Sequence, residues 1–391
     1  MFNKKTIRDV DVSGKKVLVR EDLNVPLKAG EVGDDTRILA ALPTINYLVE
    51  QNAAVIVISH LGRPGGERKE ELSLKPVADY LATLLDNKVS FVPDCIGDEA
   101  QEAVQSLQAG EVLVLENTRF HPGEKTNDPQ FSQELAALAD LFVNDAFGTS
   151  HRSHASNVGV SNHLPTVAGF LIEKELEYLG NAIENPSRPF TAILGGAKVS
   201  GKISVIRNLI EKVDHILIGG GMANTFFASQ GIKMGKSLVE EDVLSLADDL
   251  LQSAGDKLIL PVDFVIGEQF ANEAEKKIIE VGNVPADWMV MDIGPESLKL
   301  FKRIINKSKT IVWNGPMGVF EFPKFSSGTF ELAKMIAESQ AVSIIGGGDS
   351  AAAVKQAGLS ASITHVSTGG GASLQMLEGS PLPGLEAIHD R

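Results

Sequence analysis

Two lysines and several glycines in the second half of the chain have the spacing of a phosphate-binding segment. The stretch GGAKVSGK contains Gly196, four further residues and then Gly201-Lys202, which nearly matches the phosphate-binding loop G-x-x-x-x-G-K-[ST]. Ile203 stands where the magnesium-binding hydroxyl of that loop should be, so a true P-loop is disfavoured. Lys198 and Lys202 are nevertheless four residues apart at the start of a predicted helix. This spacing puts both lysines on one helix face, where both could reach a polyphosphate.

A second glycine-rich stretch, SIIGGGDSAAAV, combines groups that could bind phosphate with one that could bind a metal. A predicted buried strand is followed by three glycines, and Asp349 and Ser350 then begin an alanine-rich helix. Backbone N–H groups at a helix start can hold phosphates, and a carboxylate is a hard oxygen ligand suited to Mg²⁺. The alternative is that Asp349 is a plain N-cap, but the flanking glycines favour the metal role.

Three further glycines, Gly219, Gly220 and Gly221, follow another predicted strand, as they would in a dinucleotide-binding site. Their spacing is not G-x-G-x-x-G, and no acidic residue closing a following strand stands out about 20 residues later. An NAD-dependent dehydrogenase is therefore the weaker alternative function. A non-catalytic anion-binding or scaffold protein is another alternative, but such a protein would not need the lysine pair and Asp349.

Arginines in the first half of the chain lie in loops after predicted strands. Arginine grips phosphate and carboxylate groups with a planar fork, so several arginines in such loops predict a pocket for a small polyanion. His151 and His154 are spaced like part of a zinc site, but Arg152 between them would repel a cation, so a zinc site is disfavoured. The basic residues of these loops are Arg20, Arg37, Arg63, Arg119 and Arg152, accompanied by His60, His151 and His154.

Short apolar runs that alternate with helical stretches must position these groups. This alternation indicates parallel β/α units. In the first half, strands are predicted at residues 16–20, 53–59, 111–117 and 140–145, and helices at 36–51, 75–85 and 131–139. In the second half, the runs FTAILGG, HILIGGG, KLILPVD, WMVMDIG, TIVWNG and SIIGGG predict a second parallel sheet.

The predicted fold class is α/β, with two doubly wound parallel-sheet (Rossmann-like) domains separated by a cleft and joined by a helix from Phe170 to Ile183. Ligands of such sheets bind outside the carboxyl ends of the strands, where helix N-termini present free N–H groups. We predict an N-terminal domain at 1–170, a connecting helix and hinge at 171–185, a C-terminal domain at 186–375, and a tail at 376–391 that returns to the first domain.

Composition narrows the classes of function. The 391 residues are 43% hydrophobic and 22% charged, as in a globular protein of two domains, and the formal net charge of -15 argues against nucleic acid as a partner. The start has no apolar signal segment, and no later run reaches the roughly 18 apolar residues of a membrane span, so we expect neither export nor membrane anchoring. Cys95 is the only cysteine, which excludes an intramolecular disulfide and a Cys-based metal cluster, and we interpret it as structural. These features predict a cytoplasmic protein.

Several segments together resemble the phosphoglycerate kinase family, from near the start of the chain to near its end. Gln375 stands where an acidic residue is common in that family, and Thr118 where valine is usual, but neither position has an implied catalytic role. The segments that carry the resemblance are VREDLNVP (19–26), SHLGRP (59–64), LENTRFHPGE (115–124), NDAFGTSHRSHAS (144–156), LGGAKVSGK (194–202), WNGPMGVFE (313–321), GGGDSAAA (346–353) and STGGGASL (367–374).

The resemblance implies that the first domain binds 3-phosphoglycerate or 1,3-bisphosphoglycerate and that the second binds MgATP or MgADP. It also implies a monomer, a catalytic set of Arg37, Lys198, Lys202 and Gly371, and Asp349 as the Mg²⁺ ligand. The implied substrate-binding residues are Asp22, Leu23, Asn24, Arg37, His60, Leu61, Gly62, Arg63, Arg119 and Arg152. The implied nucleotide-binding residues are Gly195, Gly196, Ala197, Lys198, Lys202, Asn314, Glu321, Gly347, Gly348, Asp349 and Ser350.

The implied reaction is reversible phosphoryl transfer between ATP and the carboxylate of 3-phosphoglycerate, in glycolysis and gluconeogenesis. A carboxylate acceptor is already ionised at neutral pH, so the transfer needs no general base, and we expect catalysis by positioning and charge stabilisation. Because the substrates are expected on different domains, we also expect hinge bending near residues 165–190 to close the domains before in-line transfer.

Overall fold

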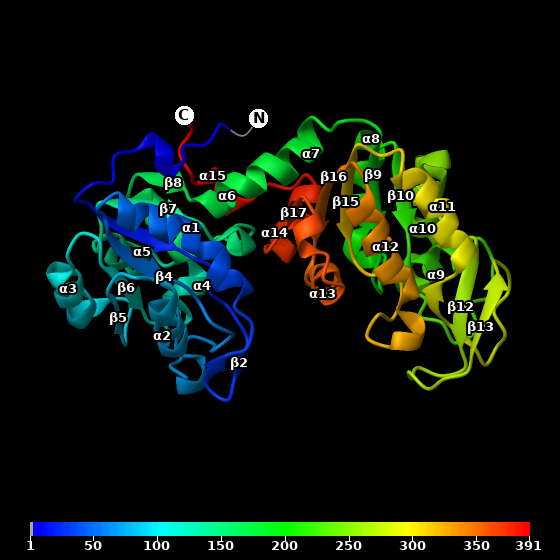
Figure 1. Cartoon of the computed structure of the whole chain (residues 1–391), viewed down its shortest axis with the longest axis horizontal. Coiled ribbons are helices and arrows are strands. Elements are labelled where there is room, and N and C mark those ends of the chain that lie inside the picture. Colours follow the sequence, from blue (N-terminus) through cyan, green and yellow to red (C-terminus); the bar gives the residue numbers. More distant parts are fainter. Residues whose placement is uncertain (1–2) are drawn as a thin grey trace. The chain divides into compact units, whose positions relative to one another are not determined.

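The computed structural model describes residues 3–391, which form two compact units (Figure 1). The first unit runs to Glu177 and also contains Pro381–Arg391, and the second unit spans Tyr178–Ser380. The chain first crosses between units in a helical segment made of α6 (Phe170–Glu175), a π-helical turn (Leu176–Gly180) and α7 (Asn181–Glu184). The crossing therefore falls within the π turn.

A parallel sheet with the strand order β5-β6-β4-β1-β7-β8 forms the centre of the first unit. Its inner strands are apolar and buried because helices cover both faces. The order reverses at β1, which has β4 on one side and β7 on the other, so the sheet is doubly wound. The strands are β1 (Lys16–Arg20), β4 (Ala54–Ile58), β5 (Val89–Val92), β6 (Val112–Leu115), β7 (Leu141–Asn144) and β8 (Thr166–Ala168), with a separate hairpin of β2 (Leu27–Lys28) and β3 (Glu31–Val32).

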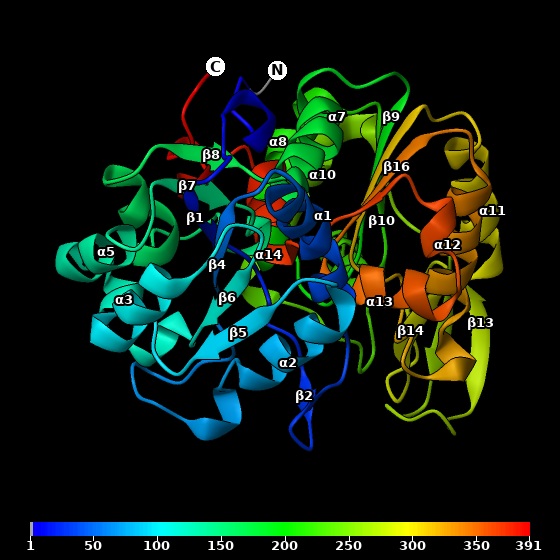
Figure 2. The same ribbon diagram turned by 60° about the vertical axis from the view of Figure 1, so that its left-hand side comes forward.

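Successive side chains of each strand face opposite sides of this sheet. Val17 and Val19 of β1 pack with α1 and α2 on one face, whereas Leu18 packs with α3 and α5 on the other (Figure 2). The helices of the first unit are α1 (Thr36–Glu50), α2 (Lys75–Leu84), α3 (Gly97–Ser106), α4 (Gly123–Thr126), α5 (Pro129–Ala136), α6 and α15 (Pro383–Glu386).

The sequence predicts β1, β4, β6 and β7 but misses the edge strands β5 and β8. β8 has only three residues, and only the last residue of β5 is buried, so neither gives a clear apolar run. Short strands at a sheet edge therefore leave too little pattern to be predicted.

The second unit contains a parallel sheet with the order β11-β10-β9-β15-β16-β17, which is the Rossmann order 3-2-1-4-5-6 in chain sequence. The fold class is thus α/β with two domains built on parallel sheets, as predicted. The strands are β9 (Phe190–Leu194), β10 (His215–Ile218), β11 (Leu258–Ile259), β15 (Thr310–Asn314), β16 (Val342–Gly346) and β17 (His365–Val366). The helices are α7, α8 (Ile203–Lys212), α9 (Gly220–Ser229), α10 (Leu244–Ala254), α11 (Pro295–Ile305), α12 (Ser327–Glu338), α13 (Gly348–Gln356) and α14 (Gly370–Leu377).

One part of the second predicted sheet is wrong. The run WMVMDIG forms β14 (Met289–Ile293), which belongs to a separate antiparallel sheet with β12 (Asp263–Gly267) and β13 (Lys276–Glu280). The cause is β12, an unpredicted strand that only residues 260–262 separate from β11. A parallel neighbour of β11 would need a much longer crossover, so β12 lies outside the main sheet, and β14 pairs with β12. The chain therefore leaves the main sheet at this point.

Residues 381–391 pack on the first unit. The Gly384 N–H donates to the Ser150 carbonyl (2.8 Å), and the Asn144 side-chain amide donates to the Gly384 carbonyl (3.1 Å). A Cβ at Gly384 would lie 2.9 Å from the Cα of Ser150, so this approach requires glycine. The predicted domain boundaries and the role of each domain stay predictions. Within residues 3–391, no helix has both the length and the apolar character needed to cross a membrane.

Asp145, directly after β7, holds the start of α6. Its carboxylate accepts hydrogen bonds from the Thr44 hydroxyl (2.5 Å) and the Ile172 N–H (3.0 Å), and Thr44 in turn accepts one from the Phe170 N–H (2.9 Å). Burial raises the pKa of the Asp145 carboxyl to about 7, although these hydrogen bonds act in the opposite direction. The start of α6 therefore rests on a carboxyl that titrates near neutral pH.

We expect Asp145→Asn to change how stability depends on pH. An unfolded aspartate titrates near pH 4, so between about pH 4 and about pH 7 the folded wild type binds the extra proton. Relative to Asp145→Asn, the wild-type free energy of unfolding should fall as the pH rises through this window, by at most about 4 kcal/mol. Urea unfolding should be followed by circular dichroism, because Trp288 and Trp313 both lie in the second unit.

The surface variant Asp86→Asn is the matched control and should follow the wild type at every pH. A stability difference between wild type and Asp145→Asn that stays constant from pH 4 to pH 8 would contradict the raised pKa of Asp145.

Candidate active site

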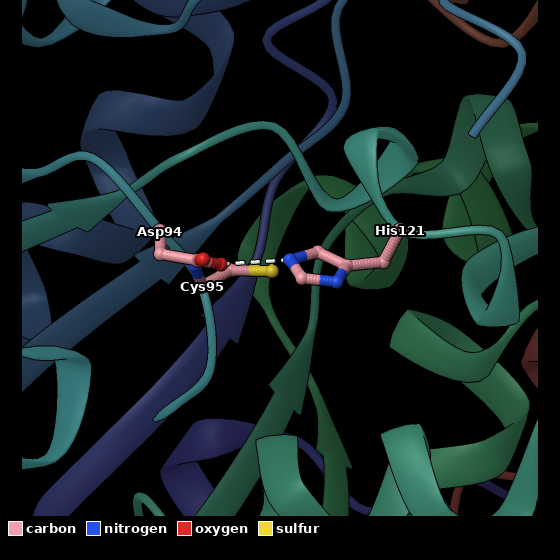
Figure 3. Close-up of side chains that lie close together, drawn as sticks. All are labelled: Asp94, Cys95 and His121. Carbon is pink, nitrogen blue, oxygen red and sulfur yellow. Dashed lines mark hydrogen bonds and ion pairs between the residues drawn. The ribbon is translucent and has the colours of Figure 1, made fainter. Parts of the chain in front are cut away.

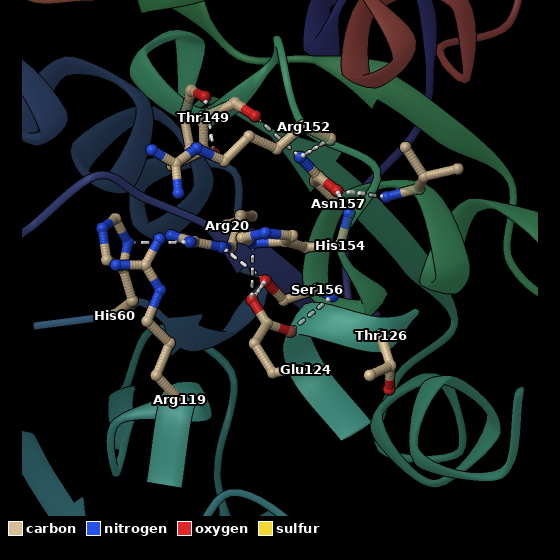
Figure 4. A network of polar contacts seen from close by, with 12 residues as sticks. Arg20, His60, Arg119, Glu124, Thr126, Thr149, Arg152, His154, Ser156 and Asn157 are labelled. Atoms are coloured by element: carbon tan, nitrogen blue, oxygen red, sulfur yellow. Dashed lines mark hydrogen bonds and ion pairs between the residues drawn. The ribbon is translucent and has the colours of Figure 1, made fainter. Parts of the chain in front are cut away.

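The first unit buries the guanidinium of Arg20 at the end of β1 (Figure 4). Its Nε donates to the Ser156 hydroxyl (2.8 Å), its Nη2 donates to Nδ1 of His60 (3.0 Å), and its Nη1 donates to the Glu21 carbonyl. Because Nδ1 of His60 accepts from a guanidinium, this ring is neutral and its proton lies on Nε2. Burial, followed by the charges of Arg20 and Arg119, holds the pKa of His60 well below its usual range.

Glu124 supplies a buried negative charge close to Arg20. Its Oε1 accepts from the Ser156 hydroxyl (2.6 Å), and its Oε2 accepts from the Ser156 N–H (2.9 Å). The Ser156 hydroxyl therefore donates a hydrogen bond to Glu124 and accepts one from Arg20. Ser156 sits in a π-helical turn (Ala155–Gly159), where Asn157 accepts a hydrogen bond from the His154 N–H (2.9 Å). Sequence reasoning missed the roles of Glu124 and Ser156, although both lie in segments that carry the family resemblance.

Arg119 and Arg152 lie close to Arg20 (Figure 4). Arg119 donates to the Gly62 carbonyl (2.8 Å), and burial, followed by the charges of Arg20 and Arg152, lowers its pKa to about 10. Burial, followed by the charges of these arginines, lowers the pKa of His154 to about 4, so this ring is neutral as well. Several positive charges placed close together favour the binding of an anion between them.

The prediction that Arg37 lies in a loop is wrong, because it lies in the first turn of α1, where it adds a partly exposed charge next to these loops. It donates to the Asn24 carbonyl (2.7 Å), and its Nη1 lies 3.3 Å from Oδ1 of Asp22. The Asn24 side chain accepts a hydrogen bond from the Gly62 N–H (2.8 Å), which ties the loop after β1 to the loop after β4. These loops follow neighbouring strands of a parallel sheet, whose carboxyl ends meet at one edge.

The remaining predicted substrate-binding residues of the first unit differ in whether their side chains could reach a ligand. The side chains of Leu23 and Leu61 are part of the hydrophobic core, so only their backbone could face a ligand. Arg63 is exposed in the loop after β4, and Arg152 donates from Nε to Nε2 of His151 (3.1 Å).

In the second unit, Lys202 links the ends of two neighbouring strands. Its Nζ donates to the carbonyl of Gly195 (2.8 Å), which follows β9, and to that of Asn314 (2.7 Å), the last residue of β15. The sheet order reverses between β9 and β15, and ligands of doubly wound sheets bind at such a point. Burial lowers the pKa of Lys202 to about 8, although the charge of Asp349 acts in the opposite direction.

The prediction that Lys198 and Lys202 share one helix face is wrong. α8 begins only at Ile203, after a short 3-10 turn (Ser200–Lys202), and Lys198 lies exposed in the loop before that turn. Val199 is fully buried and Gly196 has a φ of +95°, so the chain must turn here before a helix can start. Both lysines nevertheless line one pocket.

This pocket, of about 240 Å³, brings together most of the predicted nucleotide-binding residues. It shares Gly196, Ala197, Pro316 and Asp349 with a second pocket of about 490 Å³, which Glu321 also lines. The predicted residues that line the smaller pocket are Gly195, Gly196, Ala197, Lys198, Lys202, Asn314, Gly347, Gly348, Asp349 and Ser350.

Apolar side chains of the antiparallel sheet line the larger pocket. Phe264 comes from β12 and Met289 and Met291 come from β14, and Val319 lies in the loop after β15. Sequence reasoning missed these residues because it placed the β14 run in the parallel sheet. The signal that could have corrected it is the apolar run DFVIG (263–267), which follows β11 too closely to be its parallel neighbour.

Asp349 and Ser350 both lie in the first turn of α13, but Asp349 is exposed and Ser350 is buried. The N-cap of α13 is Gly347, so the alternative that Asp349 is the N-cap is wrong, and its carboxylate is exposed at the smaller pocket. Ser350 is buried, and its hydroxyl accepts a hydrogen bond from the Gly315 N–H (2.6 Å). This bond holds the loop after β15 against the start of α13.

Gly371 lies in the first turn of α14, whose N-cap is Gly369. A Cβ at Gly370 would lie 3.6 Å from the Cα of Gly347, so the starts of α13 and α14 are close neighbours. Two helix N-termini, each with free N–H groups, therefore converge near the predicted phosphate site.

Comparisons with known proteins agree with this geometry. The family model described as phosphoglycerate kinase matches residues 7–380. A phosphoglycerate kinase of Clostridium tetani is 56% identical over 396 residues, covering 100% of this chain and 99% of that protein, and one of Herpetosiphon aurantiacus is 54% identical with 100% of each covered. The solved phosphoglycerate kinases of Coxiella burnetii (40% identity, TM-score 0.90) and Pyrococcus horikoshii (36% identity, TM-score 0.86) each match 98% of both chains. The resemblance seen in the sequence is confirmed, a dehydrogenase is not supported, and the chain belongs to the phosphoglycerate kinase family.

Proposed function

We propose that the protein transfers a phosphoryl group reversibly between ATP and the carboxylate of 3-phosphoglycerate, giving ADP and 1,3-bisphosphoglycerate, in glycolysis and gluconeogenesis. The observation that carries the proposal is the buried Arg20, held by Ser156 and Glu124 among further arginines of the first unit. Family membership over most of the chain supports the same reaction.

In this proposal the first unit binds phosphoglycerate. Arg37, Arg119 and Arg152 offer forked donors for phosphate and carboxylate oxygens, and the Nε2–H of His60 adds a neutral donor. Arg20 sits beneath them with its donors already engaged, so it supplies charge and positions His60. Asp22, Asn24 and Gly62 hold the loops that carry these groups.

The second unit binds the nucleotide in this proposal. The apolar lining of the larger pocket suits an adenine ring, and the smaller pocket offers Lys198, Lys202 and helix N-termini to the phosphates. Asp349 fits Mg²⁺ because it presents an exposed carboxylate at the phosphate pocket, and carboxylates are preferred Mg²⁺ ligands. When bound as MgATP or MgADP, the ion would neutralise phosphate charge.

Charge stabilisation accounts for catalysis, because the ionised carboxylate acceptor needs no general base. We assign this role to Arg37, Lys198, Lys202 and the N-terminus of α14 at Gly371. An anion beside Lys202 would raise the pKa of its ammonium again, so this group is a cation when the phosphates are bound.

Further parts of the proposal concern the whole molecule. We propose that it works in the cytoplasm as a monomer, with no nucleic acid or membrane partner, and that the two units close by hinge bending near residues 165–190. The π turn at the crossing between the units supports this hinge, because π turns interrupt the regular helix ladder and are frequent at functional sites.

Arg37→Ala should lower kcat by about 100- to 1000-fold, since one donor to the transition-state charge is lost. A coupled assay with ATP, Mg²⁺, 3-phosphoglycerate, glyceraldehyde-phosphate dehydrogenase and NADH measures this change. Arg68→Ala is the matched control, because Arg68 pairs with Glu70 and takes no part in the proposed site. Full activity of Arg37→Ala would remove Arg37 from the mechanism, and no turnover by folded wild type would overturn the proposed function.

Ser156→Ala tests whether the buried network positions the anion site. The change removes the Ser156 hydroxyl, which accepts a hydrogen bond from Arg20 Nε and donates one to Glu124. The KM for 3-phosphoglycerate should therefore rise about 10-fold, while the KM for ATP stays the same. Ser132→Ala removes an equally buried hydroxyl of the same unit, which donates to the Asp128 carbonyl, and should leave both values unchanged. Equal changes in both KM values would indicate a general structural defect instead.

Hinge bending predicts a change of shape in solution. The radius of gyration measured by small-angle X-ray scattering should decrease when MgADP and 3-phosphoglycerate are both present, and less with either alone. An unchanged radius with both ligands at saturation would argue against closure.

A further inference from the structure

Asp94, Cys95 and His121 form a side-chain cluster of the first unit that the proposed reaction does not use (Figure 3). Asp94 and Cys95 follow β5, and His121 follows β6 after a short 3-10 turn (Thr118–Phe120). Since β5 and β6 are neighbouring parallel strands, their carboxyl ends bring these residues together. A carboxylate oxygen, the sulfur and a ring nitrogen all lie within 4.8 Å of one another.

We propose that these three side chains bind a divalent cation of the zinc class, so that Cys95, which the sequence alone indicates is structural, is one ligand among three of different types. Thiolate, imidazole and carboxylate together are typical zinc ligands, whereas Mg²⁺ and Ca²⁺ prefer oxygen alone. Three protein ligands would leave a fourth position for water or another small ligand. The site is separate from the Mg²⁺ role proposed for Asp349, which belongs to the second unit.

The ligands are held in place before any ion binds. Oδ1 of Asp94 accepts hydrogen bonds from the Cys95 N–H (2.6 Å) and the Ile96 N–H (3.4 Å). The same oxygen lies 2.7 Å from Nε2 of His121, and Phe131 stacks on the His121 ring at 5.1 Å. A cation would take the place of the proton in the Asp94–His121 bond, which requires these atoms to separate by only about half an ångström.

Access from solvent and local charge also favour a cation at this place. The Cys95 sulfur is fully buried, whereas Asp94 and His121 are 44% and 28% exposed, so an ion can enter from their side. Asp94, Glu124 and Glu116 all place negative charge near the sulfur, and this potential attracts a cation. Arg68 is the nearby opposing charge, but its guanidinium is engaged by Glu70 (2.8 Å) and by the Pro93 carbonyl (2.7 Å).

The position of His121 would connect the ion to the anion site. His121 is two residues after Arg119 and three before Glu124. Glu124 holds Arg20 through Ser156, and Arg119 lies close to Arg20. An ion bound here would restrain the segment that carries both.

Metal binding to the full-length protein tests the proposal directly. Chelator-treated protein, in excess Mg²⁺ and without substrates, should bind one Zn²⁺ per chain in equilibrium dialysis, and Co²⁺ should give a thiolate-to-cobalt charge-transfer absorption. Cys95→Ser should abolish this absorption, and Cys95→Ser and His121→Asn should each weaken zinc binding at least about 100-fold. His163→Asn, at an exposed histidine of the same unit, is the control and should bind as the wild type does.

Zinc binding that survives in both variants would place the metal elsewhere and overturn the proposal, as would the absence of micromolar zinc binding in the wild type. Circular dichroism should confirm that each variant is folded. If Cys95→Ser does not fold, Asp94→Asn replaces it, because this half-exposed side chain can lose its charge with little change of packing.

Discussion

A positive charge at least partly withdrawn from solvent, at the point where the sheet order reverses, is the constraint on which both units depend. In the first unit this charge is the buried Arg20, the last residue of β1. In the second unit it is the half-buried Lys202, whose ammonium joins the ends of β9 and β15. A buried cation without partners is costly, so each must receive acceptors from the surrounding loops. Each loop that supplies an acceptor is thereby held in the position that the site requires.

Arg20 and Lys202 have different hydrogen-bond acceptors, and this difference bears on their roles. Arg20 has Glu124 close by through Ser156, so much of its charge is already balanced, and it serves as a support for the outer arginines. Lys202 is held by two backbone carbonyls, and burial lowers its pKa to about 8. Its ammonium is therefore poorly compensated until a phosphate arrives, which makes it suited to direct contact with the transferred group.

The sequence could predict most of the fold, and the failures have local physical causes. Long apolar strands such as β1 and β4 are recognisable because both sheet faces are covered. β8, with three residues, gives too short a pattern. β14 shows a clear apolar run, but its partner is β12, a strand that the sequence did not predict. The predicted helix face shared by Lys198 and Lys202 does not form, because α8 begins only after Lys202, which is its N-cap.

The residues of the candidate site likewise divide into those that the sequence could predict and those that only the folded structure reveals. Charged residues such as Arg37 and Asp349 could be found from residue type and from their place in a segment that follows a strand. Ser156 and Glu124 could not, because a serine and a glutamate in loops have many ordinary roles, and only the folded chain shows that they meet at Arg20. The cluster of Cys95 with His121 depends equally on two strands becoming neighbours.

The neutral histidines complete the electrostatic argument for the first unit. His60 and His154 lie among arginines, and burial together with those charges keeps both rings unprotonated near neutral pH. The positive potential of the site is therefore carried by arginines, which do not titrate in this range. His60 can then act as a donor of fixed direction through Nε2, because Arg20 occupies its Nδ1. The buried guanidinium thus supplies charge to the site and also fixes the hydrogen-bonding direction of its neighbour.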